Sequence, residues 1–322
     1  MSILEIKNLR KTYGATVAVD DVSFSVEEGE VFGILGPNGA GKTTTVECIE
    51  GLRRRDGGEI RVLGRDPDHD HRALTRVVGV QLQEAGLQDR IRVREALDLF
   101  ATLYDDAVAP DDLLEELHLD DVATTPYGEL SGGQKQRLSI ALALVGRPRI
   151  AILDELTTGL DPVGRREAWS LVERIRERGV TVLLVTHFME EAERLCDRLA
   201  VIDRGRVVAL DTPSGMVDRL SGRQVLRFRL THALDPRLIS GLSEVRDVRT
   251  RETALGSAAP GTTYVITGTD RMTQAVMTTL TREGALAHDL RLDRASLDDA
   301  FVALVGEDVG ETMTIPKEVS HS

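Results

Sequence analysis

Cysteine and aromatic residues are scarce in this chain of 322 residues, and basic residues are fewer than acidic ones. The two cysteines, Cys48 and Cys196, are too few for a disulfide framework or a zinc site, and they suit a reducing compartment as small buried hydrophobes. Aromatic residues make up 3%, which leaves little material for stacking single-stranded nucleic acid. Acidic residues outnumber basic ones by 53 to 40, a net charge of −13 that argues against binding nucleic acid through bulk charge.

Long apolar segments are absent from the sequence as well. No run approaches the roughly 18 apolar residues of a membrane span, and residues 1–10 carry charges where a signal peptide needs an apolar region. We therefore expect a soluble chain that reaches a membrane only through a partner. The length predicts two domains, and a hydrophobic content of 41% with 29% charged residues is ordinary for folded protein.

The first two thirds of the chain alternate between strand and helix patterns, which favours an α/β core with a parallel sheet. Strand patterns cover residues 3–7, 22–26, 31–35, 150–153 and 180–185, and helix patterns cover 134–145, 164–178 and 189–196. Residues 199–202 and 206–209 flank the turn Asp203-Arg204-Gly205, which predicts a hairpin.

The pattern changes near residue 213. Strands are expected at 225–230, 245–250, 264–267 and 287–292, and helices at 236–242, 271–282 and 297–304. The order β-α-β-β-α-β predicts a small α+β domain of the ferredoxin-like type. The expected division is a first domain over 1–213, a linker over 214–223, an accessory domain over 224–306 and a flexible tail over 307–322. Residues 212–322 carry 13 basic and 15 acidic side chains, so most of the net negative charge belongs to the first domain.

A phosphate-binding motif follows the strand pattern at residues 31–35. Residues 36–43, Gly-Pro-Asn-Gly-Ala-Gly-Lys-Thr, satisfy G-x-x-x-x-G-K-[ST] between a buried strand and a helix. Glycines let backbone N–H groups wrap phosphates, and the helix N-terminus adds positive potential. Lys42 is expected to reach the β- and γ-phosphates of a nucleotide, and the Thr43 hydroxyl to bind Mg²⁺.

Two carboxylates follow the apolar strand at residues 150–153. Asp154 and Glu155 are expected at the carboxyl end of that strand, the edge of a parallel sheet where ligands bind. Asp154 suits a second Mg²⁺ contact. Glu155 points elsewhere and is the candidate to activate an attacking water.

A second glycine-containing helix start lies at residues 131–134. Ser131 and Gln134 stand in the relation of a capping box, which predicts Ser131 as the N-cap. With Gly132 and Gly133 between them, this helix start is a second place where a phosphate can bind.

Taken together, residues 3–213 resemble the nucleotide-binding subunit of an ATP-binding cassette (ABC) transporter, with all the family's motifs in order. The resemblance implies that Tyr13 stacks on adenine, that Gln83 contacts Mg²⁺ and water, that Asp161 links two sites across a dimer, and that His187 contacts the γ-phosphate. Gln81 competes with Gln83 for its role. The expected nucleotide-binding residues are Tyr13, Gly36, Asn38, Gly39, Gly41, Lys42, Thr43, Thr44, Ser131, Gly132, Gly133, Gln134 and Asp161. The expected catalytic residues are Glu155, His187 and Gln83, and the expected metal ligands are Thr43, Gln83 and Asp154.

Two further features bear on this resemblance. The family usually has proline after the catalytic glutamate, whereas this chain has Leu156, which could loosen the aim of Glu155. Residues 296–306 resemble the closing helix of antibiotic and multidrug exporter ATPases of the daunorubicin-resistance type. That resemblance implies a role in dimerisation or regulation; the alternative is a helix that only packs on its own sheet.

The sequence thus predicts an ATPase, with ATP and Mg²⁺ as cofactors, that acts as a homodimer and powers a separately encoded membrane permease. It is expected at the cytoplasmic face of the plasma membrane, and export of a drug or other hydrophobic compound is favoured. Two alternatives stay open: a soluble ABC ATPase of nucleic-acid repair or translation, and a regulator gated by nucleotide. The acidic charge disfavours nucleic acid as a partner, and the intact Lys42, Asp154, Glu155 and His187 disfavour a regulator that does not hydrolyse ATP.

Overall fold

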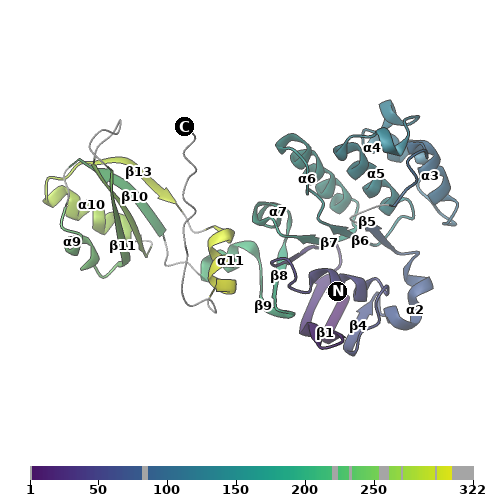
Figure 1. Ribbon diagram of the computed structural model, residues 1–322, viewed down its shortest axis with the longest axis horizontal. Helices are drawn as coiled ribbons and strands as arrows, with labels where there is room; N and C mark the ends of the chain where they lie inside the picture. The colour runs from purple at the N-terminus through teal and green to yellow at the C-terminus, as the bar shows by residue number, and fades with distance from the viewer. Residues whose placement is uncertain are drawn as a thin grey trace. The chain divides into compact units, whose positions relative to one another are not determined.

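Two units make up the chain, Met1–Pro213 and Ser214–Ser322, and each is described by itself (Figure 1). The structure, a computed structural model, describes residues 2–81, 86–219, 224–231, 234–253, 261–269, 271–293 and 296–306. Gln83, part of the linker and the C-terminal tail lie outside these residues. No helix of the described residues is long and apolar enough to cross a membrane.

A six-stranded sheet forms the centre of the first unit. Its strand order is β5-β6-β7-β3-β8-β9; β9 is antiparallel to β8 and the other neighbours are parallel. The strands are β3 (Val31–Leu35), β5 (Val78–Gln81), β6 (Ile150–Asp154), β7 (Thr181–Thr186), β8 (Arg198–Asp203) and β9 (Arg206–Asp211). The central β3 and β7 are buried at every residue, as expected of strands covered on both faces.

The predicted hairpin is formed by β8 and β9. Arg204 and Gly205 between them both have positive φ, 47° and 76°, which is the backbone of a tight hairpin turn. The hairpin and the parallel strands β3, β6 and β7 therefore agree with the sequence patterns.

A three-stranded antiparallel sheet of order β2-β1-β4 covers the parallel sheet. Its strands are β1 (Ser2–Tyr13), β2 (Thr16–Glu27) and β4 (Gly57–Val62). Ile6 and Val22 from this sheet share one apolar core with Ile34, Ile152 and Val185 from the other. The sequence patterns predicted only parts of β1 and β2 and missed β4, whose first residues are two glycines.

Seven α-helices lie among the described residues of the first unit. They are α1 (Lys42–Ile49), α2 (Pro67–Leu74), α3 (Val93–Ala101), α4 (Pro110–Glu116), α5 (Gly132–Leu144), α6 (Pro162–Glu177) and α7 (Met189–Leu195). Figure 1 shows α3, α4 and α5 gathered into a helical part of this unit. The helix patterns at 134–145, 164–178 and 189–196 are confirmed to within two residues as α5, α6 and α7.

The second unit contains a four-stranded antiparallel sheet of order β11-β12-β10-β13. Its elements are α8 (Pro213–Arg219), β10 (Gln224–Leu230), α9 (Arg237–Ser240), β11 (Val245–Thr253), β12 (Gly261–Gly268), α10 (Met272–Arg282), β13 (Ala287–Asp293) and α11 (Leu297–Gly306). One face of the sheet buries Phe228 and Tyr264, stacked with ring centroids 5.3 Å apart, against Ile239 of α9 and Val276 of α10. Tyr264 keeps its hydroxyl bonded, since Oη donates to the Leu234 carbonyl at 2.6 Å.

Candidate active site

The glycine-rich loop connects the carboxyl end of β3 to the N-terminus of α1. Gly41 has a φ of 102°, a conformation that side chains rarely adopt, and a Cβ there would lie 2.4 Å from the Ala18 carbonyl oxygen. A Cβ on Gly36 would lie 2.1 Å from the Ile202 carbonyl oxygen. Glycine is therefore required at both positions by close backbone neighbours, and the loop presents its N–H groups together with the first turn of α1.

Lys42 is held inside this loop. Its side chain is buried, and Nζ donates to the carbonyl oxygens of Gly36 at 2.8 Å and Pro37 at 3.0 Å. Burial lowers the pKa of Lys42, while the nearby carboxylates of Glu155 and Asp154 act to raise it. The ammonium group is thus placed at the mouth of a loop built to bind an anion.

The two carboxylates stand at the end of β6, as predicted. Burial of Asp154 and, after it, the negative charge of Glu155 raise the pKa of Asp154 to about 6. The positive charge of Lys42 acts to lower this pKa. Glu155 has a positive φ of 49°, and its N–H donates to the Val185 carbonyl oxygen at 2.9 Å. This bend turns the Glu155 side chain toward the end of β7, where its Oε1 lies 3.4 Å from Nδ1 of His187.

A cavity of about 180 Å³ brings the loop and the carboxylates together. It is lined by Ala18, Asn38, Gly39, Gly41, Lys42, Thr43, Thr44, Asp154 and Glu155. Eight of these nine residues are predicted from the sequence. Ala18 was not predicted as a site residue, because an alanine in a strand has no functional group that suggests ligand binding. The structure places it in the lining through the close approach of Gly41 to its carbonyl oxygen.

The other predicted site residues do not line this cavity. Ser131 caps α5 as predicted: its Oγ accepts from the Gln134 N–H at 3.3 Å, and its own N–H donates to Gln134 Oε1 at 2.8 Å. Asp161 caps α6, accepting from the Gly164 N–H at 2.7 Å. Tyr13 is 40% exposed, with the cations of Lys11 and Arg53 each 5.6 Å from its ring centroid.

Gln83 lies outside the described residues, and its competitor Gln81 is buried in β5.

The two cysteines are both free and buried, as the composition indicated. Burial raises the pKa of the Cys48 thiol to about 11, so it is a core residue rather than a nucleophile.

A family model described as "ABC transporter" matches residues 19–158. The daunorubicin resistance ATP-binding protein DrrA2 of Streptomyces coeruleorubidus is 37% identical to this chain over 305 residues, which cover 92% of this chain and 93% of the relative. The chain belongs to the ABC transporter ATP-binding proteins. A Nod factor export ATP-binding protein I of Mesorhizobium japonicum is also 37% identical, over 96% of this ABC protein and 88% of the relative.

Solved structures agree with this membership. The ATP-binding subunit of an ABC transporter is 29% identical, with a TM-score of 0.62, and covers 68% of this chain and 93% of the other. A dimeric ATP-binding cassette in a post-hydrolysis state, bound to ADP and Pi, is 28% identical with a TM-score of 0.60. The match covers 65% of this chain and 98% of that cassette. The first unit of this ABC protein is therefore an ABC-type ATPase cassette with an α/β fold, and the antiparallel sheet of the second unit is an addition to it.

The donor set of the cavity is one that suits Mg²⁺. Thr43 and Asp154 both line it, and hydroxyl and carboxylate oxygens are the ligands that Mg²⁺ prefers when phosphates complete its shell. Among the described residues, no group of three or more His, Cys, Asp or Glu side chains could hold a metal ion by itself. The residues fit a metal ion that is bound jointly with a nucleotide.

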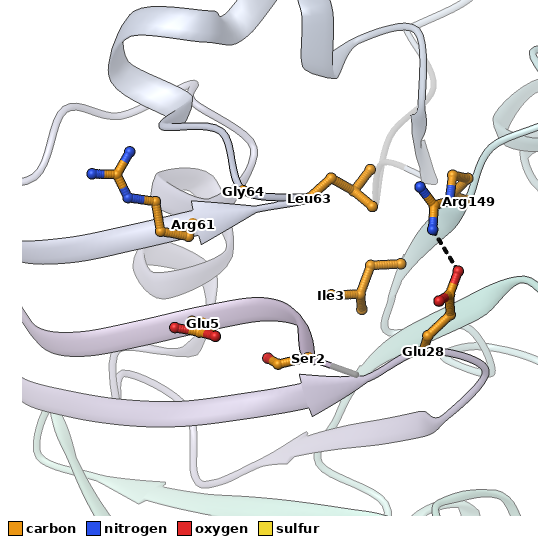
Figure 2. Close-up of a pocket in the computed structure, with 8 residues that line it drawn as sticks. All are labelled: Ser2, Ile3, Glu5, Glu28, Arg61, Leu63, Gly64 and Arg149. Atoms are coloured by element: carbon orange, nitrogen blue, oxygen red, sulfur yellow. Dashed lines mark hydrogen bonds and ion pairs between the residues drawn. The ribbon is translucent and has the colours of Figure 1, made fainter.

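A second cavity of this ABC protein, about 480 Å³, lies at the opposite edge of the parallel sheet (Figure 2). Arg149 immediately precedes β6, and Glu28, which forms an ion pair with it at one side of the cavity, lies three residues before the start of β3. Ile3 and Leu63 form its apolar wall. Because the phosphate loop follows the carboxyl end of β3, this cavity is separate from the cavity at the phosphate loop.

Proposed function

We propose that this ABC-type ATPase powers the export of a drug or another hydrophobic compound through a separately encoded permease at the cytoplasmic face of the plasma membrane. The likeness that supports export extends through both units, because DrrA2 matches 92% of the chain. That relative is named for daunorubicin resistance, and others are named for Nod factor export. The substrate class is inferred from these names.

The chemistry is assigned to the residues of the first unit. The loop N–H groups and Lys42 bind the phosphates, and Glu155 accepts the proton of the attacking water. Thr43, Asp154 and Gln83 would hold Mg²⁺, which when bound neutralises phosphate charge. His187, 3.4 Å from Glu155, would contact the γ-phosphate. Tyr13 would stack on the adenine ring.

One observation supports dimerisation: the helix start at Ser131 does not line the cavity of its own phosphate loop. If residues 131–134 bind the γ-phosphate, they do so in a second copy, and a symmetric dimer then encloses two nucleotides. Asp161 would link the two sites. The dimeric relative bound to ADP and Pi supports this arrangement.

The second unit is proposed to be a ferredoxin-like accessory domain over 224–306, joined by a linker over 214–223 to the cassette of 1–213. Its element order β10-α9-β11-β12-α10-β13 and its sheet order β11-β12-β10-β13 support this type. A role in dimerisation or regulation is carried over from the resemblance of residues 296–306.

The observation that carries this function is the cavity shared by Lys42, Asp154 and Glu155, and the test is Glu155→Gln. The variant should bind ATP and double its mass by light scattering, but not hydrolyse the nucleotide. Glu59→Gln, a substitution at an exposed residue of β4, is the control and should match wild type in ATP binding, mass and ATP hydrolysis. The tagged protein should also copurify with an integral membrane protein. Full turnover by Glu155→Gln would remove Glu155 from the role of general base.

A further inference from the structure

Two positively charged side chains lie over the ring of Tyr13, the residue proposed to stack on adenine. Nζ of Lys11 and the guanidinium carbon of Arg53 are each 5.6 Å from the ring centroid. A cation within about 6 Å of an aromatic centroid is attracted by the electron-rich face of the ring. The Tyr13 residue is still 40% exposed, so its ring keeps surface for a base. None of the assigned steps uses either cation.

Glu47 of α1 fixes the position of Arg53. Nε of Arg53 donates to Glu47 Oε2 at 2.8 Å, and the Arg53 backbone N–H donates to the Glu47 carbonyl oxygen at 3.0 Å. The Glu47 side chain is 28% exposed and that of Arg53 48%. An arginine that is already anchored loses less side-chain entropy when it contacts a third group. Arg53 therefore presents its guanidinium to Tyr13 from a defined position.

Lys11 is anchored in the same way by Asp56, in the loop between α1 and β4. Its Nζ donates to Asp56 Oδ1 at 3.0 Å. Oδ2 of Asp56 accepts from the N–H and the hydroxyl of Thr12, each at 2.7 Å, and the Asp56 N–H donates to the Arg10 carbonyl oxygen at 2.8 Å. Hydrogen bonds from Thr12 and, after it, Lys11 lower the pKa of Asp56 to about 2, so this anchor is charged at neutral pH. The loop is thus fastened to β1 beside Tyr13.

These contacts connect the two ends of the proposed nucleotide site. The helix α1 begins at Lys42 in the phosphate loop and carries Glu47 in its second turn. The chain then passes through Arg53 to β4, which pairs with β1, the strand that ends at Tyr13. Glu47 and Arg53 therefore link the helix after the phosphate loop to the ring proposed to receive the base. Such a link aligns the base with the phosphates before any chemistry begins.

We propose that Arg53, anchored by Glu47, is a positioning residue for nucleotide binding that holds the Tyr13 ring in the orientation for stacking on adenine, with Lys11 as a second support. This inference rests on the proposed stacking of Tyr13. It accounts for two anchored cations that converge on one partly exposed ring. Arg53 acts on the base end of the nucleotide alone, and the phosphates and the catalytic carboxylates do not depend on it.

The test is steady-state ATP hydrolysis by the full chain carrying Arg53→Ala. A cation–π contact at an exposed site corresponds to about 2- to 5-fold in an equilibrium constant, so KM for ATP should rise by about that factor. The value of kcat should stay within about 1.5-fold, as expected when binding alone is weakened. Arg54→Ala removes the same charge from the next exposed residue and is the matched control. Its KM should stay within about 1.3-fold of wild type.

Inorganic triphosphate separates an effect on the base from an effect on the fold. It offers phosphates to the loop around Lys42 but has no base to stack. As a competitive inhibitor it should have the same Ki in Arg53→Ala as in wild type, whereas a distortion passed through Glu47 into α1 would weaken both ligands.

A double variant tests whether Arg53 acts through the Tyr13 ring. Tyr13→Ala should raise KM for ATP by about 5- to 100-fold, the range for loss of stacking on one base. Adding Arg53→Ala to that variant should raise KM no further, because the ring that Arg53 positions is already gone.

An unchanged KM for ATP in Arg53→Ala would overturn the role of Arg53. An equal rise in the Ki of inorganic triphosphate, or a loss of ATP affinity that multiplies with that of Tyr13→Ala, would overturn it as well. Tyr13→Ala by itself tests the proposed function. A wild-type KM in that single variant would remove Tyr13 from adenine binding and, with it, the basis of this role.

Discussion

Charged side chains are buried in the first unit and lie at the surface in the second, among the residues that the structure describes. The buried charged residues are Glu30, Lys42 and Glu191, all in Met1–Pro213. In the second unit the buried polar residues are the hydroxyl-bearing Thr262 and Thr279, and Arg249 on the open face of the sheet has a side chain that is 83% exposed. Both units bury aliphatic and aromatic side chains, so the contrast between their interiors lies in the polar and charged groups that each buries.

The three buried charges also differ among themselves. Glu30 is paired with Arg198 at 3.2 Å and accepts from the Glu27 N–H at 2.7 Å, which is what a structural carboxylate needs. Lys42 donates to the carbonyl oxygens of Gly36 and Pro37 and has Glu155 and Asp154 nearby, whereas both carboxylate oxygens of Glu191 lack a hydrogen-bond partner among the described residues. Since buried charge is costly without an ionic partner, Glu30 is the buried charge whose partners compensate it most directly.

The strongest way to sharpen this comparison is to remove one cation from each unit. Lys42→Ala should lower ATP hydrolysis by about 100- to 1,000-fold, because it deletes a preorganised charge at the phosphates. Arg249→Ala should leave hydrolysis within about 2-fold, since its charge lies in solvent. Phosphate release by both purified proteins checks this. An equal loss of ATP hydrolysis in the two variants would contradict the assignment of phosphate binding to the first unit.

In the second unit, the largest effect is expected from a substitution in the apolar core, which lowers the stability of the fold. Phe228→Ala removes a fully buried ring that stacks on Tyr264 and should cost about 3–5 kcal/mol of the free energy of unfolding of this unit. Leu238→Ala, at a side chain that is 42% exposed, should cost less than about 0.5 kcal/mol. Calorimetry of the full chain measures both. A Phe228→Ala protein with unchanged thermal transitions would refute the assignment of this core.

A pH series tests the half-buried Glu50 of the first unit. Burial and, after it, the negative charges of Asp154 and Glu47 raise the pKa of Glu50 to about 8. Between the unfolded value of about 4.3 and 8, the folded chain keeps a proton that the unfolded chain releases, so stability falls as pH rises through this window. Glu50→Gln stays neutral and should exceed wild type by about 2 kcal/mol at pH 9 but by almost nothing near pH 4. Denaturant titrations at the two pH values check this, and a constant difference would contradict it.

Leu156→Pro should have the smallest effect. Leu156 is fully buried beside Glu155, and exchange for the proline that the family usually has there should cost about 1 kcal/mol of lost packing. The bend at Glu155 is already set by its N–H bond to Val185, so hydrolysis should change by less than about 3-fold. A large gain in ATPase rate would show instead that Leu156 leaves Glu155 badly aimed.

Much of the fold could be predicted because local patterns carry it. Residues 31–35 form β3 with the predicted bounds, and Ser131 caps α5 through the predicted capping box. The sequence patterns missed the helices α2, α3 and α4, and also β4, which begins with two glycines, and the short β5. Both of these strands depend on their neighbours for pairing. Strand pairing between distant segments leaves little trace in the sequence around one element.

The candidate site was predictable where a motif spans consecutive residues, as at 36–44 and 154–155. The burial of Glu191 was not predictable, because it depends on how α7 packs against elements that are distant in the sequence. The sequence shows Glu190 and Glu191 as two equal acids in the first turn of a helix. Only packing buries one and exposes the other.

The most direct test of the account is phosphate release from ATP and Mg²⁺ by the purified full chain, measured beside Glu155→Gln under identical conditions. The account predicts steady turnover by the native chain and at least about a 100-fold loss in the variant, with ATP binding retained. Equal rates in the two proteins would contradict the claim that the buried site of the first unit hydrolyses ATP through Glu155.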